Sequence, residues 1–540
     1  MIYVSGIAKN YGSKTLYKDG SFQINRGDKI GLVGTNGSGK TTILKILAKE
    51  ESVDAGSVSI SDKLSVGYFS QNLEQMSGRS ALSEVESAHP RFKIVQSELQ
   101  TLEGKLSEDL SENEMTKVLE RYGELQAEFE AIGGYEFESK AAEILTGLGI
   151  GPDDYAKPCE TFSGGWKMRI ALAKILLINP DLLLMDEPTN HLDVESIIWL
   201  EAWLKDYKGA LLMTSHDREF MNRVISKIIE VANKGLHIYG GNYDFFERER
   251  SIRHQQLIAS AKRQEDMLAK EKEFIARFAA RASHAAQVQS RVKKIDKIDI
   301  IEIPSEEKEM KFTWPEIPRG GDDVLSVQNL TKIWTTDEKQ KLVFQEANAL
   351  VKRMDRVAVI GVNGAGKSTF MKIVVGHTEP SSGTYKVGPS IEIGYFSQNS
   401  LDVLNPDSTV LDEVQAHMPV ANLGQIRNLL GSLMFSGDEV DKKIKFLSGG
   451  EKSRVVLATI LCKPINFLVL DEPTNHLDIK SREILMDALK SFSGTVMMVS
   501  HDRHFLRALT TRVFSLGKNK LVTFDGTYDE YLERAEKLMA

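Results

Sequence analysis

Two glycine-rich segments of this 540-residue chain have the residue types and spacing of phosphate-binding loops. Both follow the pattern Gly-x-x-x-x-Gly-Lys-Ser/Thr, and the second lysine lies 327 residues after the first. In such a loop the backbone N–H groups surround phosphate oxygens, the lysine neutralises phosphate charge, and the hydroxyl is a Mg²⁺ ligand. The residues predicted to do this are Gly34, Asn36, Gly37, Gly39, Lys40, Thr41 and Thr42, and Gly361, Asn363, Gly364, Gly366, Lys367, Ser368 and Thr369.

Each half of the chain also has two adjacent acids directly after an apolar run. Asp186 and Glu187 close one run, and Asp471 and Glu472 close the other. A continuous apolar run is typical of a parallel strand buried on both faces, and such sheets bind ligands at the carboxyl ends of their strands. We expect the two aspartates to hold Mg²⁺, directly or through water, and the two glutamates to orient or deprotonate an attacking water. Solvated acids at a strand end are the competing interpretation, which the accompanying phosphate loops disfavour.

The elements around these residues are those that the chemistry requires. Apolar runs at 29–33 and 357–360 predict the strands that lead into the glycine loops. Apolar periodicity at 42–47 and 370–374 predicts the helices that follow. Strand, loop and helix in this order distinguish a phosphate loop from a chance run of glycines. The predicted fold class is therefore α/β.

The motifs belong to a long internal repeat. Matching segments lie 327 residues apart up to Gln71 and Gln398, and 285 residues apart from Ser163 and Ser448 onward. The first copy therefore contains about 42 extra residues, which local matching places near 90–135. Repeats of over 200 residues indicate duplicated domains rather than a solenoid. The predicted domains are 1–244 with the insert, a linker at 245–320, and 321–540.

The insert has the pattern of a helical hairpin. Apolar residues at 95, 99, 102 and 106 form one helical stripe, those at 115, 119, 122, 125 and 129 form a second, and a polar turn separates them. Residues 98–130 contain ten acids and three basic residues, so this arm should avoid nucleic-acid phosphates. We expect it to contact a basic protein or only the base of the linker, with a solvated structural hairpin as the alternative.

The linker has the opposite charge. Residues 274–295 contain no acid, and alanines and small polar residues there permit close approach of a phosphate backbone. The candidate RNA-binding residues are Arg277, Arg281, Arg291, Lys293 and Lys294. A solvated pair of interdomain helices is the alternative interpretation.

Composition restricts the class of protein. The formal net charge is −8, which excludes a chain that is basic throughout but permits a local basic patch. We find no uncharged apolar run of about 18 residues and no basic start followed by an apolar core, so neither a membrane span nor a secretory signal is expected. The only cysteines, Cys159 and Cys462, lie in different halves, which indicates a reducing compartment and neither a disulfide framework nor a metal cluster.

The order of the motifs resembles the ATP-binding cassette (ABC) superfamily. In each half the phosphate loop is followed by Gln71 or Gln398, a Ser-Gly-Gly signature, the acid pair and a histidine, His216 or His501. The fold that the resemblance implies is two phosphate-loop ABC domains in tandem, with a helical-hairpin arm and a helical interdomain linker. It implies ATP and Mg²⁺ as cofactors, the glutamines as ATP and Mg²⁺ contacts, and the histidines as catalytic residues beside the glutamates.

Cassettes of this superfamily pair head to tail, so that each ATP lies between the phosphate loop of one and the signature of the other. The helix N-terminus at the signature would present N–H groups to the γ-phosphate. The resemblance implies Ser448, Gly449 and Gly450 at the Lys40 site, Ser163, Gly164 and Gly165 at the Lys367 site, and Tyr11 and Trp334 as aromatic residues that stack on adenine. Both sites keep lysine, glutamate and histidine, so both should hydrolyse ATP.

Two cassettes in one chain, a long charged linker and Glu-Pro-Thr-Asn-His-Leu-Asp in both halves are similar to the tandem ABC-F family. The family implies a cytoplasmic ATPase, a monomer with its own cassettes paired, that acts on the ribosome during translation. ATP-driven closure would position the linker helices against peptidyl-tRNA and rRNA, the arm would reach a ribosomal protein, and hydrolysis would release the ribosome. The alternatives are a transporter ATPase with a separate membrane subunit, an antibiotic-resistance protein that protects the ribosome, and a DNA-repair ATPase. The short loop near 285–290 favours a general translation factor.

Overall fold

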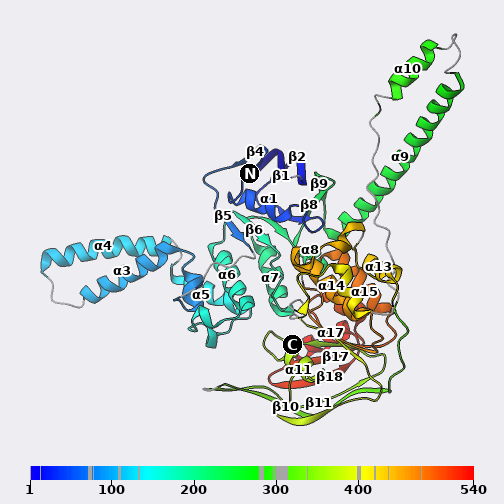
Figure 1. Ribbon diagram of the computed structural model, residues 1–540. Coiled ribbons are helices and arrows are strands. Elements are labelled where there is room, and N and C mark those ends of the chain that lie inside the picture. The colour runs from blue at the N-terminus through cyan, green and yellow to red at the C-terminus, as the bar shows by residue number, and fades with distance from the viewer. Residues whose placement is uncertain are drawn as a thin grey trace.

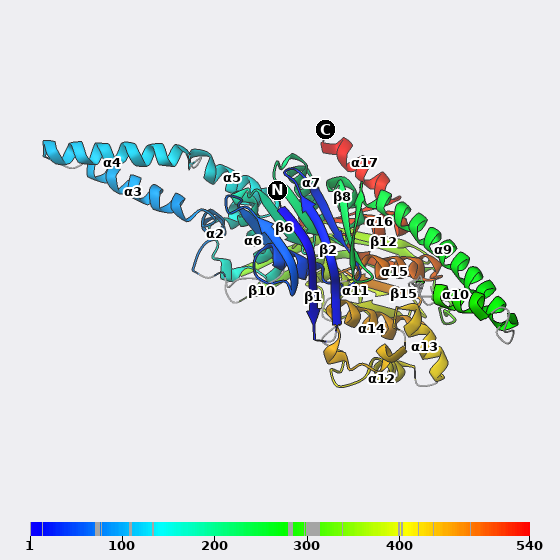
Figure 2. The same cartoon turned by 90° about the horizontal axis from the view of Figure 1, so that it is seen from above.

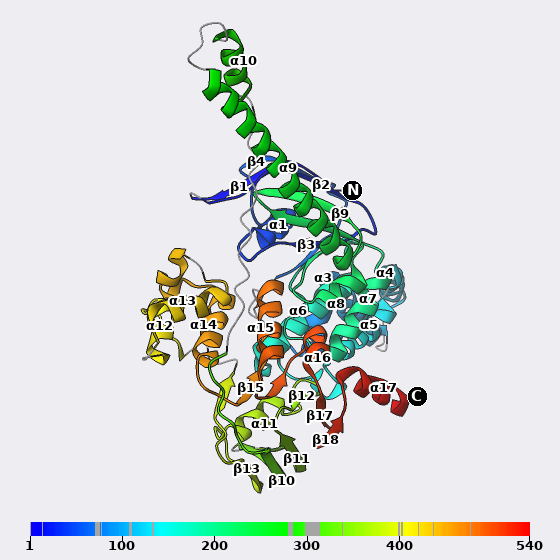
Figure 3. The same cartoon turned by 90° about the vertical axis from the view of Figure 1, so that its right-hand side faces the viewer.

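The computed structural model has two α/β cassettes that meet along a seam, with two helical projections (Figures 1 and 3). The structure describes the chain except residues 1, 13, 71–75, 77, 107–110, 132–133, 279–284, 296–297, 299–313, 337–338, 398–399, 401–402, 419–420, 436, 476 and 540. The predicted fold class, tandem α/β cassettes with added helical segments, is confirmed.

Each cassette is built on a six-stranded sheet of the same topology. The strand order is β5-β6-β7-β3-β8-β9 in the first and β14-β15-β16-β12-β17-β18 in the second, and only the last pair of each sheet is antiparallel. The strands are β3 (Lys29–Val33), β5 (Val66–Phe69), β6 (Leu182–Asp186), β7 (Ala210–Thr214), β8 (Lys227–Ala232), β9 (Gly235–Gly240), β12 (Arg356–Ile360), β14 (Ile393–Phe396), β15 (Phe467–Asp471), β16 (Thr495–Val499), β17 (Arg512–Gly517) and β18 (Lys520–Asp525).

A three-stranded antiparallel sheet accompanies each main sheet, in the orders β2-β1-β4 and β11-β10-β13. The strands are β1 (Ile2–Tyr11), β2 (Lys14–Ile24), β4 (Ala55–Ile60), β10 (Asp323–Thr336), β11 (Lys339–Lys352) and β13 (Ser382–Val387). Apolar side chains of β1 and β2 share one core with helix α1 and one face of the first main sheet. The small sheet and α1 therefore cover that face.

Helices connect the strands of the two cassettes. Those of the first are α1 (Lys40–Leu47), α2 (Ala81–Glu86), α5 (Gly134–Gly147), α6 (Gly164–Ile178), α7 (Val194–Asp206) and α8 (Arg218–Val224). Those of the second are α11 (Lys367–Val374), α12 (Val410–His417), α13 (Leu423–Ser432), α14 (Gly449–Leu461), α15 (Ile479–Ser491), α16 (Arg503–Leu509) and α17 (Tyr528–Met539). None of the described helices is both long enough and apolar enough to cross a membrane.

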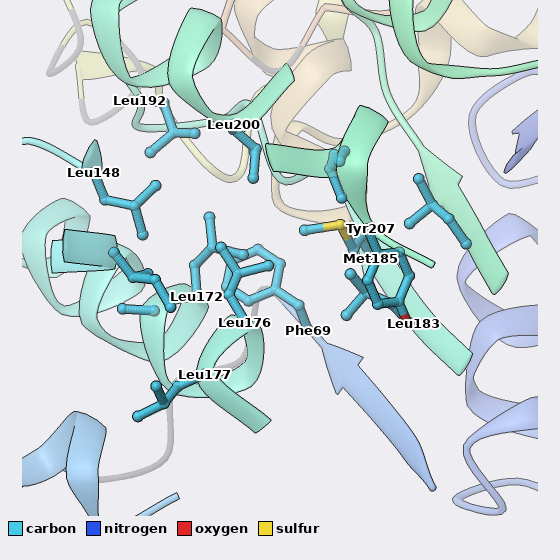
Figure 4. Packing of buried hydrophobic residues seen from close by; sticks show 14 of the residues in the cluster. Phe69, Leu148, Leu172, Leu176, Leu177, Leu183, Met185, Leu192, Leu200 and Tyr207 are labelled. Carbon is cyan, nitrogen blue, oxygen red and sulfur yellow. The ribbon is translucent and has the colours of Figure 1, made fainter. Parts of the chain in front are cut away.

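Strand β6 shows why the acid pair ends an apolar run. Its Leu183 and Met185 are fully buried in the core that includes α6 and α7 (Figure 4). Leu182 and Leu184, which point to the opposite face, belong to the core with α1. Because both faces of the strand are covered, its polar chemistry is confined to the carboxyl end, where Asp186 lies.

The insert is a hairpin of α3 (Pro90–Leu106) and α4 (Glu112–Ala131) that projects from the first cassette (Figures 1 and 2). The predicted apolar stripe of its second helix is wrong at one position. Leu119 is 52% exposed, and Val118 is half-buried instead. With Val118 in place of Leu119, the apolar stripe advances in regular steps of three and four residues along one helix face, and Leu119 lies off that face.

The linker begins with α9 (Tyr243–Phe278), which projects from the first cassette on another side from the arm, and α10 (Ala285–Ile295) returns beside it (Figures 1 and 2). Beyond α10 the linker is held on the second cassette. Trp314 Nε1 donates to the Ala488 carbonyl at 2.8 Å, and its ring lies 4.3 Å from that of Phe492. The linker is thus attached to both cassettes.

Candidate nucleotide-binding sites

Each phosphate loop joins a strand in the middle of its main sheet to the following helix. Strand β3 leads into α1, and β12 leads into α11. Gly39 and Gly366, directly before these helices, have φ values of 102° and 98°, in the left-handed region that favours glycine. A Cβ at Gly366 would also lie 2.2 Å from Val343 Cγ1. Backbone conformation and space therefore both require the second glycine of the motif.

The loop lysines fold back onto their own loops. Lys40 Nζ donates to the carbonyls of Gly34 at 2.8 Å and Thr35 at 3.2 Å, and Lys367 makes the equivalent bonds at 2.7 and 3.2 Å. Burial lowers the pKa of both ammonium groups, and nearby carboxylates oppose that shift. Each loop thus holds a partly desolvated cation, which is the environment that strengthens binding of phosphate oxygens.

The aspartate that ends each apolar strand lies against the hydroxyl of its phosphate loop. Thr41 Oγ1 donates to Asp186 Oδ2 at 2.7 Å, and Thr214 Oγ1 donates to Oδ1 at 2.7 Å. In the second cassette Ser368 Oγ donates to Asp471 Oδ1 at 3.1 Å. The structure therefore brings together the hydroxyl and the carboxylate that the sequence assigned to Mg²⁺.

The next residue in each strand motif is a glutamate that faces a histidine. His216 donates its backbone N–H to Glu187 Oε2 at 3.0 Å, and its Nε2 lies 3.5 Å from Oε1. His501 Nε2 lies 3.0 Å from Glu472 Oε1. The two glutamates have φ values of 52° and 54°, a conformation that costs a residue other than glycine about 1–3 kcal/mol. Such strain concentrates at functional sites, where it holds a side chain in one direction.

Burial sets the protonation of these groups. It raises the pKa of Glu187, and it raises the pKa of Glu472 to about 7. It lowers the pKa of His216 and of His501 to about 3, so both imidazoles are neutral near pH 7. A carboxylate of raised pKa beside a neutral imidazole is suited to accept a proton from water.

The donor atoms at each loop fit Mg²⁺. The hydroxyl and carboxylate oxygens of Thr41 and Asp186 are ligands that a hard cation prefers, and Mg²⁺ at phosphate sites takes one or two protein ligands with phosphate and water. Within the described part of the chain no three His, Cys, Asp or Glu side chains form an all-protein metal site. Among the same residues, Glu187 Oε1 and Glu472 Oε2 are buried without a hydrogen-bond partner, so each glutamate has an oxygen available to a water molecule.

The two candidate adenine-stacking residues have matching surroundings. The side chain of Tyr11, on β1, is 51% exposed and that of Trp334, on β10, is 44% exposed. Lys9 Nζ lies 5.5 Å from the centre of the Tyr11 ring, and Lys332 Nζ lies 4.2 Å from that of Trp334. The paired lysines support the equivalence of the two aromatic residues, which the unequal loops after them had left open in the sequence.

Each Ser-Gly-Gly signature begins a helix. Ser163 is the N-cap of α6, and Ser448 is the N-cap of α14, where its hydroxyl accepts from the Glu451 N–H. A helix N-terminus presents backbone N–H groups and positive potential, which is what the predicted γ-phosphate contact requires.

Three predicted site residues, Gln71, Gln398 and Arg281, lie outside the described residues, as does the side chain of Arg291. Their assigned roles stay predictions.

Two acids that the sequence repeats, Asp193 and Asp478, were not assigned a role from it. Asp193, of the first cassette, accepts a hydrogen bond from the Asn363 N–H in the second phosphate loop at 3.2 Å. Although the carboxylate is buried, the Arg169 guanidinium at 3.1 Å lowers its pKa to about 2. The first cassette therefore contributes a charged residue to the second loop, and recurrence of this acid in both halves was the signal for it.

Other charged residues cross the seam as well. Arg503 of α16 donates to Glu201 of α7, and their side chains are 2% and 4% exposed. Arg507 Nη1 donates to Glu219 Oε2 of α8 at 2.6 Å. These two arginines and two glutamates were not assigned a role from the sequence, because charged residues on a helix are normally solvated.

The described candidate RNA-binding residues lie near the far end of the linker. Arg277 is exposed and donates to Glu273 at 2.6 Å. Lys293 and Lys294 are exposed on α10, with Lys294 Nζ 3.6 Å from Glu271. These two acids precede the acid-free stretch, so the surface is less basic than that stretch alone predicts.

Comparisons with known proteins agree with this geometry. Residues 17–190 and 344–475 match a family model described as ABC transporter, and residues 229–314 match a second model of the same description. YdiF of Bacillus subtilis (strain 168) is 36% identical over 535 residues, which cover 99% of this chain and 83% of YdiF. ABC transporter F family member 2 of Arabidopsis thaliana is 34% identical over 538 residues, 99% of this chain and 79% of the relative.

Solved structures share the tandem fold. One titled RNase-L Inhibitor superposes with a TM-score of 0.60 at 17% identity, over 98% of this chain and 92% of its own. Another, titled as a model of ribosome-bound archaeal Pelota and ABCE1, has a TM-score of 0.56 at 17% identity over 96% of this chain and 78% of its own.

The tandem sheets, paired phosphate loops and strand-end acids define an ABC ATPase, a protein that binds and hydrolyses ATP. With relatives at 34% identity over nearly its whole length, the chain belongs to the ABC-F family.

Proposed function

We propose that this ATPase is a switch: ATP closes the seam between the cassettes, closure moves the helical linker, and hydrolysis reverses both. Each site would consist of the phosphate loop of one cassette and the signature helix of the other. The contact between Asp193 and the Asn363 N–H supports this head-to-tail arrangement, because it joins one cassette to the phosphate loop of its neighbour.

Within a site the roles follow from burial and charge. Lys40 would exchange its bonds to loop carbonyls for bonds to the β- and γ-phosphates, since a desolvated ammonium gains most from a charged acceptor. Mg²⁺ held by Thr41 and Asp186 would neutralise phosphate charge. Glu187 would take a proton from the attacking water, and neutral His216 would hold that water or the γ-phosphate in place. In the second site Lys367, Ser368, Asp471, Glu472 and His501 would have the same roles.

The proposed coupling between the first ATP site and the linker is supported by the ion pairs of one arginine. Two residues after His216, Arg218 begins α8, and its guanidinium lies 2.9 Å from Asp244 and 2.6 Å from Glu247, both in the first turns of α9. The same guanidinium lies 3.8 Å from Glu483 of the second cassette. A shift of the His216 segment on closure would therefore act directly on the base of the linker helix.

The proposed partner of the linker is the ribosome, with tRNA and rRNA at its tip. Membership of the ABC-F family supports it, and ABCE1, which has the same tandem fold, is described on a ribosome. The exposed Arg277, Lys293 and Lys294 fit a phosphate-bearing surface. The acidic arm would face a basic ribosomal protein.

The test is sedimentation of a cell lysate through a sucrose gradient with ATP. Glu187→Gln with Glu472→Gln should trap the closed state and move the protein into the ribosomal fractions. The matched control, Lys40→Ala with Lys367→Ala, should stay at the top because it cannot bind the phosphates. A trapped variant that stays at the top, or that floats with membrane vesicles as a transporter ATPase would, overturns the proposal.

The linker contact has its own test. Reversing the charge of Arg277, Lys293 and Lys294 to Glu in the trapped variant should weaken ribosome binding, and the slope of log affinity against log salt should fall by about 2–3 as phosphate contacts are lost. The control carries the same charge change elsewhere, at exposed Lys63, Lys518 and Lys520. Equal losses in both variants would mean that net charge, not the linker, binds RNA.

A further inference from the structure

One arginine of the second cassette reaches the catalytic segment of the first. Arg482 lies on α15, and its side chain is only 13% exposed. Its Nη1 donates to the backbone carbonyl of His216 at 3.0 Å and to Asp502 Oδ2 at 3.1 Å. Its Nε donates to the Leu477 carbonyl at 3.0 Å, which holds the guanidinium against its own cassette.

The His216 residue is therefore bonded on both sides of its backbone. Its N–H donates to Glu187 Oε2 at 3.0 Å, and its carbonyl accepts from Arg482. A hydrogen bond from a charged donor is about twice as strong as one between neutral groups, so it restricts the backbone that aims both the imidazole and the glutamate. The second cassette thus fixes the orientation of groups in the first site.

The repeat has no such group at the equivalent place. The residue 285 positions before Arg482 is Ile197, which is 2% exposed and packed in the core of the first cassette. An isoleucine side chain has no hydrogen-bond donor, so it cannot hold the carbonyl of His501 as Arg482 holds that of His216. The two sites are therefore connected differently to the opposite cassette.

We infer that Arg482 is a positioning residue for the Lys40 site, through the carbonyl of His216, and that it makes hydrolysis there dependent on docking of the second cassette. The inference rests on the catalytic roles proposed above for Glu187 and His216. It concerns how the two sites differ and not what the linker binds. In this arrangement Arg482 gives the Lys40 site a link to the opposite cassette that the Lys367 site lacks at the equivalent position.

The experiment measures each site separately, in a variant in which the glutamate of the other site is replaced. Turnover in Glu472→Gln reports the Lys40 site, and turnover in Glu187→Gln reports the Lys367 site. Arg482→Ala should lower kcat at least tenfold in the first background, with KM for ATP within about threefold, and change it less than twofold in the second. Arg482→Lys, which keeps one charged donor, should recover part of the loss.

The control is Arg507→Ala, which removes another ion pair across the seam, 2.6 Å from Glu219, without a contact to His216. Its effect should be equal in the two backgrounds. If Arg482→Ala lowers turnover equally at both sites, or at neither, Arg482 is only a seam contact and the inference is wrong. If the double Glu→Gln variant keeps full ATPase activity, the proposed catalytic roles fail first, and the inference fails with them.

Discussion

Arg503 is the residue whose removal should disturb the seam most. Its guanidinium donates to Glu201 and lies 3.8 Å from Glu219 and 4.0 Å from Asp217, all of the first cassette. Arg503→Met keeps much of the apolar volume and removes the charge. Asp217 would then stay buried without this cation, and Glu201 would lose its shorter ion pair and keep Arg223 at 3.4 Å. Glu219 would keep Arg507 at 2.6 Å.

The magnitude follows from the burial of the pair. Removing one partner of a buried ion pair costs about 3–5 kcal/mol because the other charge stays desolvated. At about 3 kcal/mol, the ratio of open to docked molecules rises about 140-fold, since each 1.4 kcal/mol is a factor of ten. Glu201→Met should cost about 1 kcal/mol, roughly fivefold, because Arg503 keeps two other carboxylates. The double variant should recover part of the loss, since it also removes the buried carboxylate at 201.

Single-molecule fluorescence energy transfer without nucleotide measures that ratio. Dyes at Asp62→Cys and Lys518→Cys would lie at exposed positions on different cassettes, and both native cysteines are buried. Arg512→Met is the matched control, because Arg512 forms its ion pairs within the second cassette, at 2.6 and 2.8 Å. A change of less than threefold for Arg503→Met, or one no larger than that of the control, would show that this buried pair does not hold the seam.

Three further predictions test single groups. Thr41→Ala should raise the Mg²⁺ concentration for half-maximal ATPase activity about tenfold or more, because it removes the hydroxyl beside Asp186; an unchanged Mg²⁺ titration contradicts the assignment. Asp193→Ala in the Glu187→Gln background should lower turnover about tenfold, because the second phosphate loop loses its acceptor; full turnover would mean that this contact is incidental. Burial, and then the charge of a neighbouring aspartate, raises the pKa of Asp217 to about 6 from 3.8, so the folded state favours its protonated form. The stability this provides is complete below about pH 3.8 and lost as the pH rises through 6, about 1.4 kcal/mol between pH 5 and pH 8. The free energy of unfolding of Asp217→Asn, measured by chemical denaturation, should therefore rise relative to that of the wild type between pH 5 and pH 8. A difference between the two proteins that does not change with pH would refute the assignment.

The chemistry inside each site could be predicted because short motifs fix it locally. Thr41 and Asp186 are 145 residues apart, yet a phosphate loop and a strand end open on the same edge of a parallel sheet, so their contact follows from the fold class. Which residues of the second arm helix, α4, face the first could not be predicted so well. Val118 and Leu119 are both apolar, and the choice between them depends on which face meets α3, which sequence spacing alone leaves undecided.

The contacts across the seam lay beyond sequence reasoning for a different reason. A repeat at a fixed offset predicts equivalent residues at equivalent places, but Arg482 corresponds to Ile197. The carbonyl that Arg482 binds is that of His216, 266 residues away and in the other cassette. Neither residue type nor periodicity encodes such a pairing, because it depends on how two finished domains dock.

The asymmetry of the seam also bears on which cassettes pair. The positions equivalent to Glu201 and Glu219 in the second cassette carry Met486 and His504. Two second cassettes paired with each other would bury Arg503 opposite a methionine and a histidine in place of the two glutamates, and the loss of carboxylate partners from a buried guanidinium is unfavourable. Pairing of the two halves places both carboxylates opposite the arginines of the second cassette and leaves neither half without a partner. The seam therefore favours pairing of a first cassette with a second one, which is the pairing that the proposed closure requires.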